Sequence, residues 1–269
     1  MNRSVSRMSR VMLPCVLTLL AGGACSSKSA TTAPTNTPGP NDLVMFFSPM
    51  YSAFGGSHQF KIPVVVDNVD PTAIVWSASD PSMVDMVYDA TLQGEMITTR
   101  KAGKVTITAK MGTQSGSSLL TISAASDADW DIGNMRYNNG VVLTTLPQGM
   151  ARPDGGSDFS CTNCHGDTAS GTTNQFRTVA HTPEQTGGFS DTDLIGIFTM
   201  GTVPPGSYFD TTVVPYQQWQ GFHVWKMTPD EARGIIVYLR ALAPQTQTGA
   251  RGAFGGRNNR RDAGAARTD

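Results

Sequence analysis

The chain has 269 residues and a formal net charge of −1 at pH 7. A nucleic-acid-binding protein carries a clear excess of Lys and Arg, so this charge predicts no nucleic-acid partner. The four cysteines lie in three different sequence contexts, and each context indicates a different role.

The N-terminus has the pattern of a secretory signal peptide. It begins with Arg3, Arg7 and Arg10 and continues with an apolar run over residues 11–20, followed by small residues up to Cys25. The apolar run is too short for a stable transmembrane helix. We therefore expect residues 1–24 to be removed after export.

The residues before Cys25 resemble the signal of a bacterial lipoprotein, in which the cysteine becomes the lipidated first residue. The usual motif has Leu three positions before the cysteine, where this chain has Gly22, so simple cleavage to an unanchored periplasmic protein is the alternative. Ser26 differs from the Asp of an inner-membrane retention signal, which favours the outer membrane. The resemblance implies a protein of the bacterial cell envelope, anchored to a membrane through lipid. Residues 25–41 are rich in Ser, Thr, Pro and Ala and are expected to form a flexible tether.

Residues 42–124 have the pattern of an all-β domain. Apolar and polar residues alternate over residues 105–109, as a half-buried strand requires. Asp, Pro and Gly turns separate short runs of this kind, which predicts a β-sandwich of immunoglobulin size. The expected strands cover residues 60–62, 74–76, 83–88, 95–100, 104–110 and 117–122.

Two segments of this region resemble bacterial Ig-like modules of the second Big family. Residues 76–84, Trp-Ser-Ala-Ser-Asp-Pro-Ser-Met-Val, are similar to its W-S-S-x-x-P-x-V-A segment. Residues 102–109, Ala-Gly-Lys-Val-Thr-Ile-Thr-Ala, are similar to its A-G-T-A-T-I-T-A strand. We interpret Trp76 as a core residue and expect no chemistry in this domain.

The run Cys161-Thr162-Asn163-Cys164-His165 is the most informative motif of the chain. A C-x-x-C-H run is the attachment site of c-type haem, in which Cys161 and Cys164 form thioethers with the haem vinyl groups and His165 is the proximal iron ligand. A structural zinc site needs four ligands, and the sequence has no second C-x-x-C. A thioredoxin-type pair needs a βαβ setting, whereas the flanks here are loop-like.

Two helices are predicted after this motif. Ser190 with Asp193 forms a capping box, and the helix that follows should run to Met200 and end at Gly201. A second helix starts at Thr228, with Pro and an acid in its first turn. Its apolar residues recur at helical spacing until Pro244 closes it, and its internal glycine indicates that another helix passes close by.

These features resemble monohaem class I cytochrome c domains. Residues 238–242, Tyr-Leu-Arg-Ala-Leu, match the end of their C-terminal helix, and residues 182–191 resemble a segment of dehydrogenase-associated cytochromes. By the same resemblance, residues 131–137 are the N-terminal helix, with Gly133 and Tyr137 packing near Gly234 and Tyr238. The predicted fold class is therefore multidomain, an all-β Ig-like sandwich followed by an all-α cytochrome c domain over residues 125–244.

The distal iron ligand is the open question of the sequence. Related cytochromes supply Met from an M-P-Y/F segment, where this chain has Val214. We expect His223, within apolar residues before the last helix, to be the distal ligand. Met200 is the alternative, a site without a protein ligand remains open, and Met227 is more typical of a packing residue. His181 is expected to be an edge contact or a surface residue.

The sequence predicts an envelope-anchored electron carrier with one covalent haem c. Acidic residues outnumber Lys and Arg between residues 127 and 244, which favours redox protein partners with a basic face. A peroxidase-like haem enzyme with an open distal site is one alternative, although no paired acids or nucleophile motif supports it. An Ig-led adhesion or scaffold protein is the other. Residues 245–269 are rich in Gly and Arg and are expected to form a disordered tail.

Overall fold

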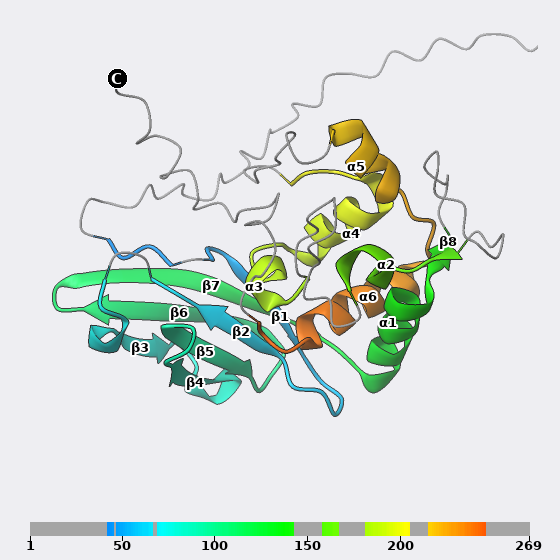
Figure 1. Cartoon of the computed structure of the whole chain (residues 1–269). Coiled ribbons are helices and arrows are strands. Elements are labelled where there is room, and N and C mark those ends of the chain that lie inside the picture. The colour runs from blue at the N-terminus through cyan, green and yellow to red at the C-terminus, as the bar shows by residue number, and fades with distance from the viewer. Residues whose placement is uncertain are drawn as a thin grey trace, which may run out of the picture. The chain divides into compact units, whose positions relative to one another are not determined.

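The computed structural model describes residues 42–45, 47–66, 69–142, 158–166, 181–204 and 215–245. All of these residues belong to one compact unit, which spans residues 38–269 (Figure 1). None of the helices in these ranges combines the length and the apolar composition that crossing a membrane requires.

Two β-sheets form the first part of the described chain. The larger sheet has the strand order β1-β7-β6-β3, and the smaller sheet has the order β2-β5-β4. All neighbours pair antiparallel except β1 and β7, which are parallel. The strands are β1 Met50–Phe54, β2 Lys61–Val64, β3 Val75–Ala78, β4 Val84–Asp89, β5 Gly94–Thr99, β6 Gly103–Met111 and β7 Gln114–Ala124.

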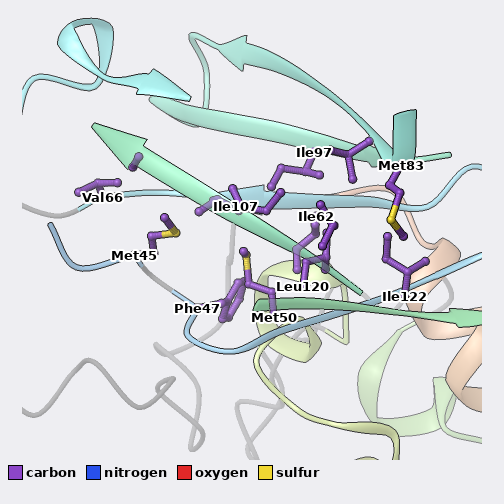
Figure 2. Packing of buried hydrophobic residues seen from close by; sticks show 14 of the residues in the cluster. Met45, Phe47, Met50, Ile62, Val66, Met83, Ile97, Ile107, Leu120 and Ile122 are labelled. Carbon is purple, nitrogen blue, oxygen red and sulfur yellow. The ribbon is translucent and has the colours of Figure 1, made fainter. Parts of the chain in front are cut away.

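Apolar side chains from both sheets fill the space between them. Along β6, the buried residues are Val105, Ile107 and Ala109, and the residues between them are more exposed. This period of two puts one face of the strand into the core. Figure 2 shows the buried cluster, in which Ile62 and Ile97 of the smaller sheet pack with apolar residues of the larger one. The alternation seen in the sequence is thus the cause of the two-layered arrangement.

The expected strands coincide with β2 to β7 to within a few residues. Strand β1 was not predicted, because its residues Met-Tyr-Ser-Ala-Phe lack a clear alternation. The burial pattern of β1 shows the reason, because Ser52 and Ala53 are both buried although they are adjacent in the strand. Small side chains can be covered on either face of a sheet, so they leave no periodic signal.

The helices follow the sheets in the chain. Three of them start with a complete capping box, in which a Ser or Thr side chain and an acid three residues later satisfy the first turn. The predicted helices over residues 191–200 and 229–241 are confirmed, and Gly201 ends the first of them in the left-handed conformation, with φ 58°. The helices are α1 Asp127–Asn139, α2 Thr162–His165, α3 Pro183–Thr186, α4 Asp191–Met200, α5 Tyr216–Phe222 and α6 Pro229–Ala241, and short 3-10 turns cover Pro71–Ala73 and Pro81–Met83.

Helices α1 and α6 cross at two facing glycines. A Cβ atom on Gly133 would overlap the carbonyl oxygen of Gly234 and lie 2.8 Å from the Cβ of Tyr238. A Cβ atom on Gly234 would lie 2.9 Å from the backbone nitrogen of Gly133. The prediction that Gly133 and Gly234 pack together is confirmed, and it explains why α6 tolerates an internal glycine.

The buried side chain of Arg240 connects the helices to the larger sheet. Its guanidinium group donates hydrogen bonds to the Tyr51 carbonyl oxygen on β1, at 2.7 Å, and to the Phe189 carbonyl oxygen before α4, at 2.9 Å. It also forms an ion pair with Asp191 at 2.7 Å, and Asp191 accepts a further hydrogen bond from Ser123 on β7 at 2.6 Å. Arg240 is only 2% exposed, so these bonds form inside the molecule.

The predicted fold class is wrong. The described chain is a mixed structure of strands and helices within one compact unit, not an all-β domain followed by an all-α cytochrome c domain. A two-stranded antiparallel ladder, β8 Val141–Val142 with β9 Asp158–Phe159, lies within the supposedly all-α region. Strands of two residues are too short to show a periodicity in the sequence. The buried polar contacts of Arg240, which join the helices to the larger sheet, also leave no mark in the amino-acid composition.

Candidate functional site

The C-x-x-C-H run forms one helical turn that is tied to α1. Cys161 precedes α2, and the backbone N–H groups of Cys164 and His165 donate to its carbonyl oxygen at 3.1 and 2.9 Å. The N–H of Cys161 donates to the Tyr137 carbonyl oxygen at 3.1 Å. Gly166 ends the turn with φ 79°, a conformation that favours glycine. Positions three apart lie on the same face of a helical turn, so the two thiols are neighbours.

Neither cysteine forms a disulfide, and both lie in a mostly buried environment. Cys161 is 4% exposed, and Cys164 is half-buried. Burial raises the pKa of both thiols, that of Cys161 well above its usual range. A reactive redox cysteine has the opposite property, a lowered pKa that favours the thiolate. The environment of this pair therefore does not fit a thioredoxin-like centre.

Three histidines come together beside the cysteines. The rings of His165 and His181 stack with their centroids 3.6 Å apart, and the ring of His223 lies 6.5 Å from that of His165. These residues come from α2, from the segment before α3 and from the end of α5, which are far apart in the sequence. The tertiary fold alone brings them together.

Hydrogen bonding fixes the chemical state of His223. Its Nδ1 atom lies 2.8 Å from the carbonyl oxygen of Trp219. A carbonyl oxygen only accepts hydrogen bonds, so Nδ1 must carry the proton. Burial lowers the pKa of His223 to about 4, so the ring is neutral at pH 7 and Nε2 keeps its lone pair. This arrangement is typical of metal-ligating histidines, which donate their other N–H to a carbonyl or carboxylate.

Aromatic side chains surround His223. The ring of Trp219 stacks on it at 4.7 Å, and the ring of Trp225 lies parallel to it, to within 8°, at 6.3 Å. Both indoles are buried, and Phe198 of α4 belongs to the same apolar cluster. Helix α5, which His223 directly follows, was not predicted from the sequence. The spacing of Trp219 and His223, four residues apart, is the signal that could have indicated this helix.

His181 is part of the site and not a surface residue. Its Nδ1 atom lies 3.1 Å from the Tyr137 hydroxyl, and Tyr137 is fully buried. Burial, followed by the nearby histidines, lowers the pKa of His181 well below its usual range. His181 also stacks directly on the predicted proximal ligand, a contact that the sequence did not indicate.

The two methionines considered as iron ligands differ in their placement. Met200, at the end of α4, is 57% exposed and is not part of the histidine cluster. Met227 packs against the edge of the apolar core just before the start of α6. Cys25 and Val214 lie outside the described residues.

The described residues fit a haem with two imidazole ligands. A metal–imidazole bond of about 2.0 Å, with roughly 1.2 Å from nitrogen to ring centroid, puts two axial rings about 6.4 Å apart. The measured separation of His165 and His223 is 6.5 Å. No cluster of His, Cys, Asp or Glu in the described ranges is arranged to hold a bare metal ion.

A second group of buried polar atoms follows His181. In the described part of the chain, the Thr182 hydroxyl and both carboxyl oxygens of Glu184 are buried without a hydrogen-bond partner of good geometry. Burial raises the pKa of Glu184 to about 7, against the opposing effect of nearby donors on Thr182 and Gln245. No function was predicted for this carboxyl group.

Comparisons with known proteins do not identify the chain. No protein-family model matches it, and no curated protein matches it. Among solved structures, the M1 domain from titin is 9% identical and covers 30% of this chain and 93% of its own length, with a TM-score of 0.24. An endo-fucoidan hydrolase from glycoside hydrolase family 107 is 13% identical and covers 38% of this chain and 16% of its own, with a TM-score of 0.27. Similarity at this level assigns neither a fold nor a function, so the resemblances to Big modules and to cytochromes stay predictions.

Proposed function

We propose that the protein is an envelope-anchored c-type cytochrome that carries one covalently attached haem and transfers single electrons. The observation that carries the proposal is the separation of 6.5 Å between the rings of His223 and His165, the histidine of the C-x-x-C-H run. In the proposal, Cys161 and Cys164 hold the haem, His165 is the proximal ligand and His223 is the distal ligand. Redox proteins of the cell envelope are the proposed partners.

When bound, haem supplies a one-electron Fe(III)/Fe(II) couple. The chain would supply two imidazoles, of which His223 is held with its proton on Nδ1 by the Trp219 carbonyl oxygen. The buried indoles of Trp219 and Trp225 both pack against the ring of His223. Two strong ligands favour electron transfer over binding of an external ligand, and two histidines give a lower potential than a His/Met pair.

Covalent haem attachment is tested by expressing the protein with a cytochrome c maturation system. The haem should stay with the polypeptide in acidified organic solvent, because thioether bonds survive where coordination bonds do not. The double variant Cys161→Ser with Cys164→Ser should release all of its haem under the same conditions. A control variant at an exposed position, Met135→Leu, should retain it. Complete extraction of haem from the wild-type protein would contradict the proposal.

Binding of carbon monoxide to the reduced protein distinguishes the electron carrier from a haem enzyme with an open distal site. A carrier with His223 on the iron should not bind carbon monoxide readily, because the sixth position is taken. Rapid binding that converts the whole reduced spectrum would favour the open-site enzyme instead.

A further inference from the structure

The two candidate iron ligands are held at a defined angle to each other. The ring planes of His165 and His223 are inclined by 69°, which is close to perpendicular. Each ring also has an aromatic neighbour of its own, on a different element of the fold. The angle is therefore a property of two separate packing environments.

On the proximal side, the neighbour is His181. Its ring stacks on His165 at 3.6 Å with an interplanar angle of 29°. His181 is itself bonded to the hydroxyl of Tyr137, which is fully buried and packs on Tyr238 at 5.1 Å. A stacked ring that cannot move away prevents His165 from turning about its Cβ–Cγ bond.

On the distal side, the neighbour is Trp219. Its carbonyl oxygen binds Nδ1 of His223, and its ring stacks on His223 at 4.7 Å with an interplanar angle of 29°. The ring of Trp225 also lies parallel to that of His223, and its indole N–H donates a hydrogen bond to the Phe222 carbonyl oxygen at 2.6 Å. The hydrogen bond fixes one atom of His223, and the stacked indole fixes the plane of its ring.

We propose that His181 and Trp219 are positioning residues that hold the planes of the two axial imidazoles nearly perpendicular. This inference rests on the proposed haem site. The orientation of axial imidazole planes sets the splitting of the iron d orbitals in the low-spin ferric state. Nearly parallel planes give a three-line rhombic electron paramagnetic resonance signal, and nearly perpendicular planes give a single broad feature at large g. Perpendicular planes also raise the potential relative to parallel planes with the same two ligands.

The test is low-temperature paramagnetic resonance of the haem-loaded, oxidised protein. The wild type should give the broad large-g feature. His181→Ala and Trp219→Leu should each lose it in favour of a rhombic signal, because one imidazole is then free to turn. His181→Phe and Trp219→Phe should keep it, because both retain a flat ring. The Trp219 variants leave the backbone carbonyl oxygen in place, so they separate the effect of stacking from that of the hydrogen bond.

Optical spectra of the same samples separate this inference from the proposed function. If the wild type has no low-spin haem, the proposed function fails. If it has low-spin haem with a rhombic signal, the proposed cytochrome stands and the perpendicular arrangement is overturned. Retention of the large-g feature in both His181→Ala and Trp219→Leu would also overturn the role of these residues. If an Ala or Leu variant fails to load haem, the signals of the wild type and of the two Phe variants still test the perpendicular arrangement.

Discussion

At the scale of single residues, hydrogen bonding and burial determine which histidine can act as a ligand. The Trp219 carbonyl oxygen leaves His223 a single neutral tautomer, and burial keeps it neutral. Met200 has the sulfur atom that cytochromes often use, yet its side chain faces solvent. The chemistry of a side chain therefore depends on its placement more than on its type.

The distal ligand is tested by paired substitutions in the haem-loaded protein. His223→Ala should move the ferric absorption spectrum towards high spin, because the strong sixth ligand is lost. Met200→Ala should stay low-spin, since its side chain is 57% exposed in the wild type. The near-infrared band of a Met–Fe(III) bond should be absent. The reverse pattern would assign the ligand to Met200, and a spectrum indifferent to both changes would point to Met227 or to an open site.

Glu184 should make the stability of the protein depend on pH. Its pKa is about 7 in the folded state against an ordinary value of 4.5, so the folded state holds a proton that the unfolded state releases. Stability from this group is therefore present below pH 4.5 and is lost as the pH rises to 7, by at most about 3 kcal/mol. Glu184→Gln should be more stable than the wild type at pH 8 and about equal at pH 4, as measured by denaturant unfolding. An equal difference in stability between the variant and the wild type at pH 4 and pH 8 would show that the Glu184 carboxyl group does not cause the pH dependence.

At the scale of elements, the contact between α1 and α6 positions the site. The close approach at Gly133 and Gly234 packs the two helices together. The end of α1 then carries Tyr137, whose carbonyl oxygen holds the C-x-x-C-H turn and whose hydroxyl contacts His181. A change at the glycine crossing should therefore reach the proposed haem site through α1.

Gly133→Ala tests this crossing. Alanine favours a helix by roughly 1 kcal/mol over glycine, but here its methyl group would overlap the Gly234 carbonyl oxygen. The net effect should be a loss of about 1–3 kcal/mol in the free energy of unfolding. Gly196→Ala in α4 is the matched control, since the nearest obstacle to its methyl group is the Thr202 hydroxyl at 2.7 Å, which can turn away. Equal stability of the two variants would show that the helices do not depend on this contact.

At the scale of the whole molecule, Arg240 joins the sheets to the helices. Its guanidinium group donates hydrogen bonds to the carbonyl oxygens of Tyr51 on β1 and Phe189 before α4, and it forms an ion pair with the Asp191 carboxylate. Removing a buried charge of this kind leaves its partners buried without a hydrogen bond. The resulting loss in the free energy of unfolding exceeds the net contribution of the intact pair. We therefore expect Arg240 to couple the unfolding of the larger sheet to that of the helices.

Arg240→Met should lower the free energy of unfolding by about 3–5 kcal/mol. Unfolding followed by haem absorbance and by far-ultraviolet circular dichroism should then separate into two transitions, whereas the wild type should show one. Arg233→Met is the control, because Arg233 is 58% exposed in its ion pair with Asp129 and such pairs contribute about 0–1 kcal/mol. A single transition in Arg240→Met would mean that apolar packing alone couples the two parts.

Anchoring also concerns the whole molecule. Cys25→Ser should move the protein from the membrane fraction to the soluble fraction, because a lipid-modified cysteine is the proposed anchor. Fractionation and the mass of the mature N-terminal peptide measure this. A wild-type protein that is soluble and carries no lipid mass would contradict the lipoprotein prediction.

The sequence by itself determined the features that depend on neighbouring residues. The alternation of β2 to β7, the capping boxes of α4 and α6, and the paired glycines are local patterns with direct physical meaning. Only the tertiary structure decided the rest. It joined the sheets and helices in one mixed unit, added β1 and the short β8–β9 ladder, and brought His181 onto His165. These features depend on contacts between residues distant in the sequence, which no local periodicity records.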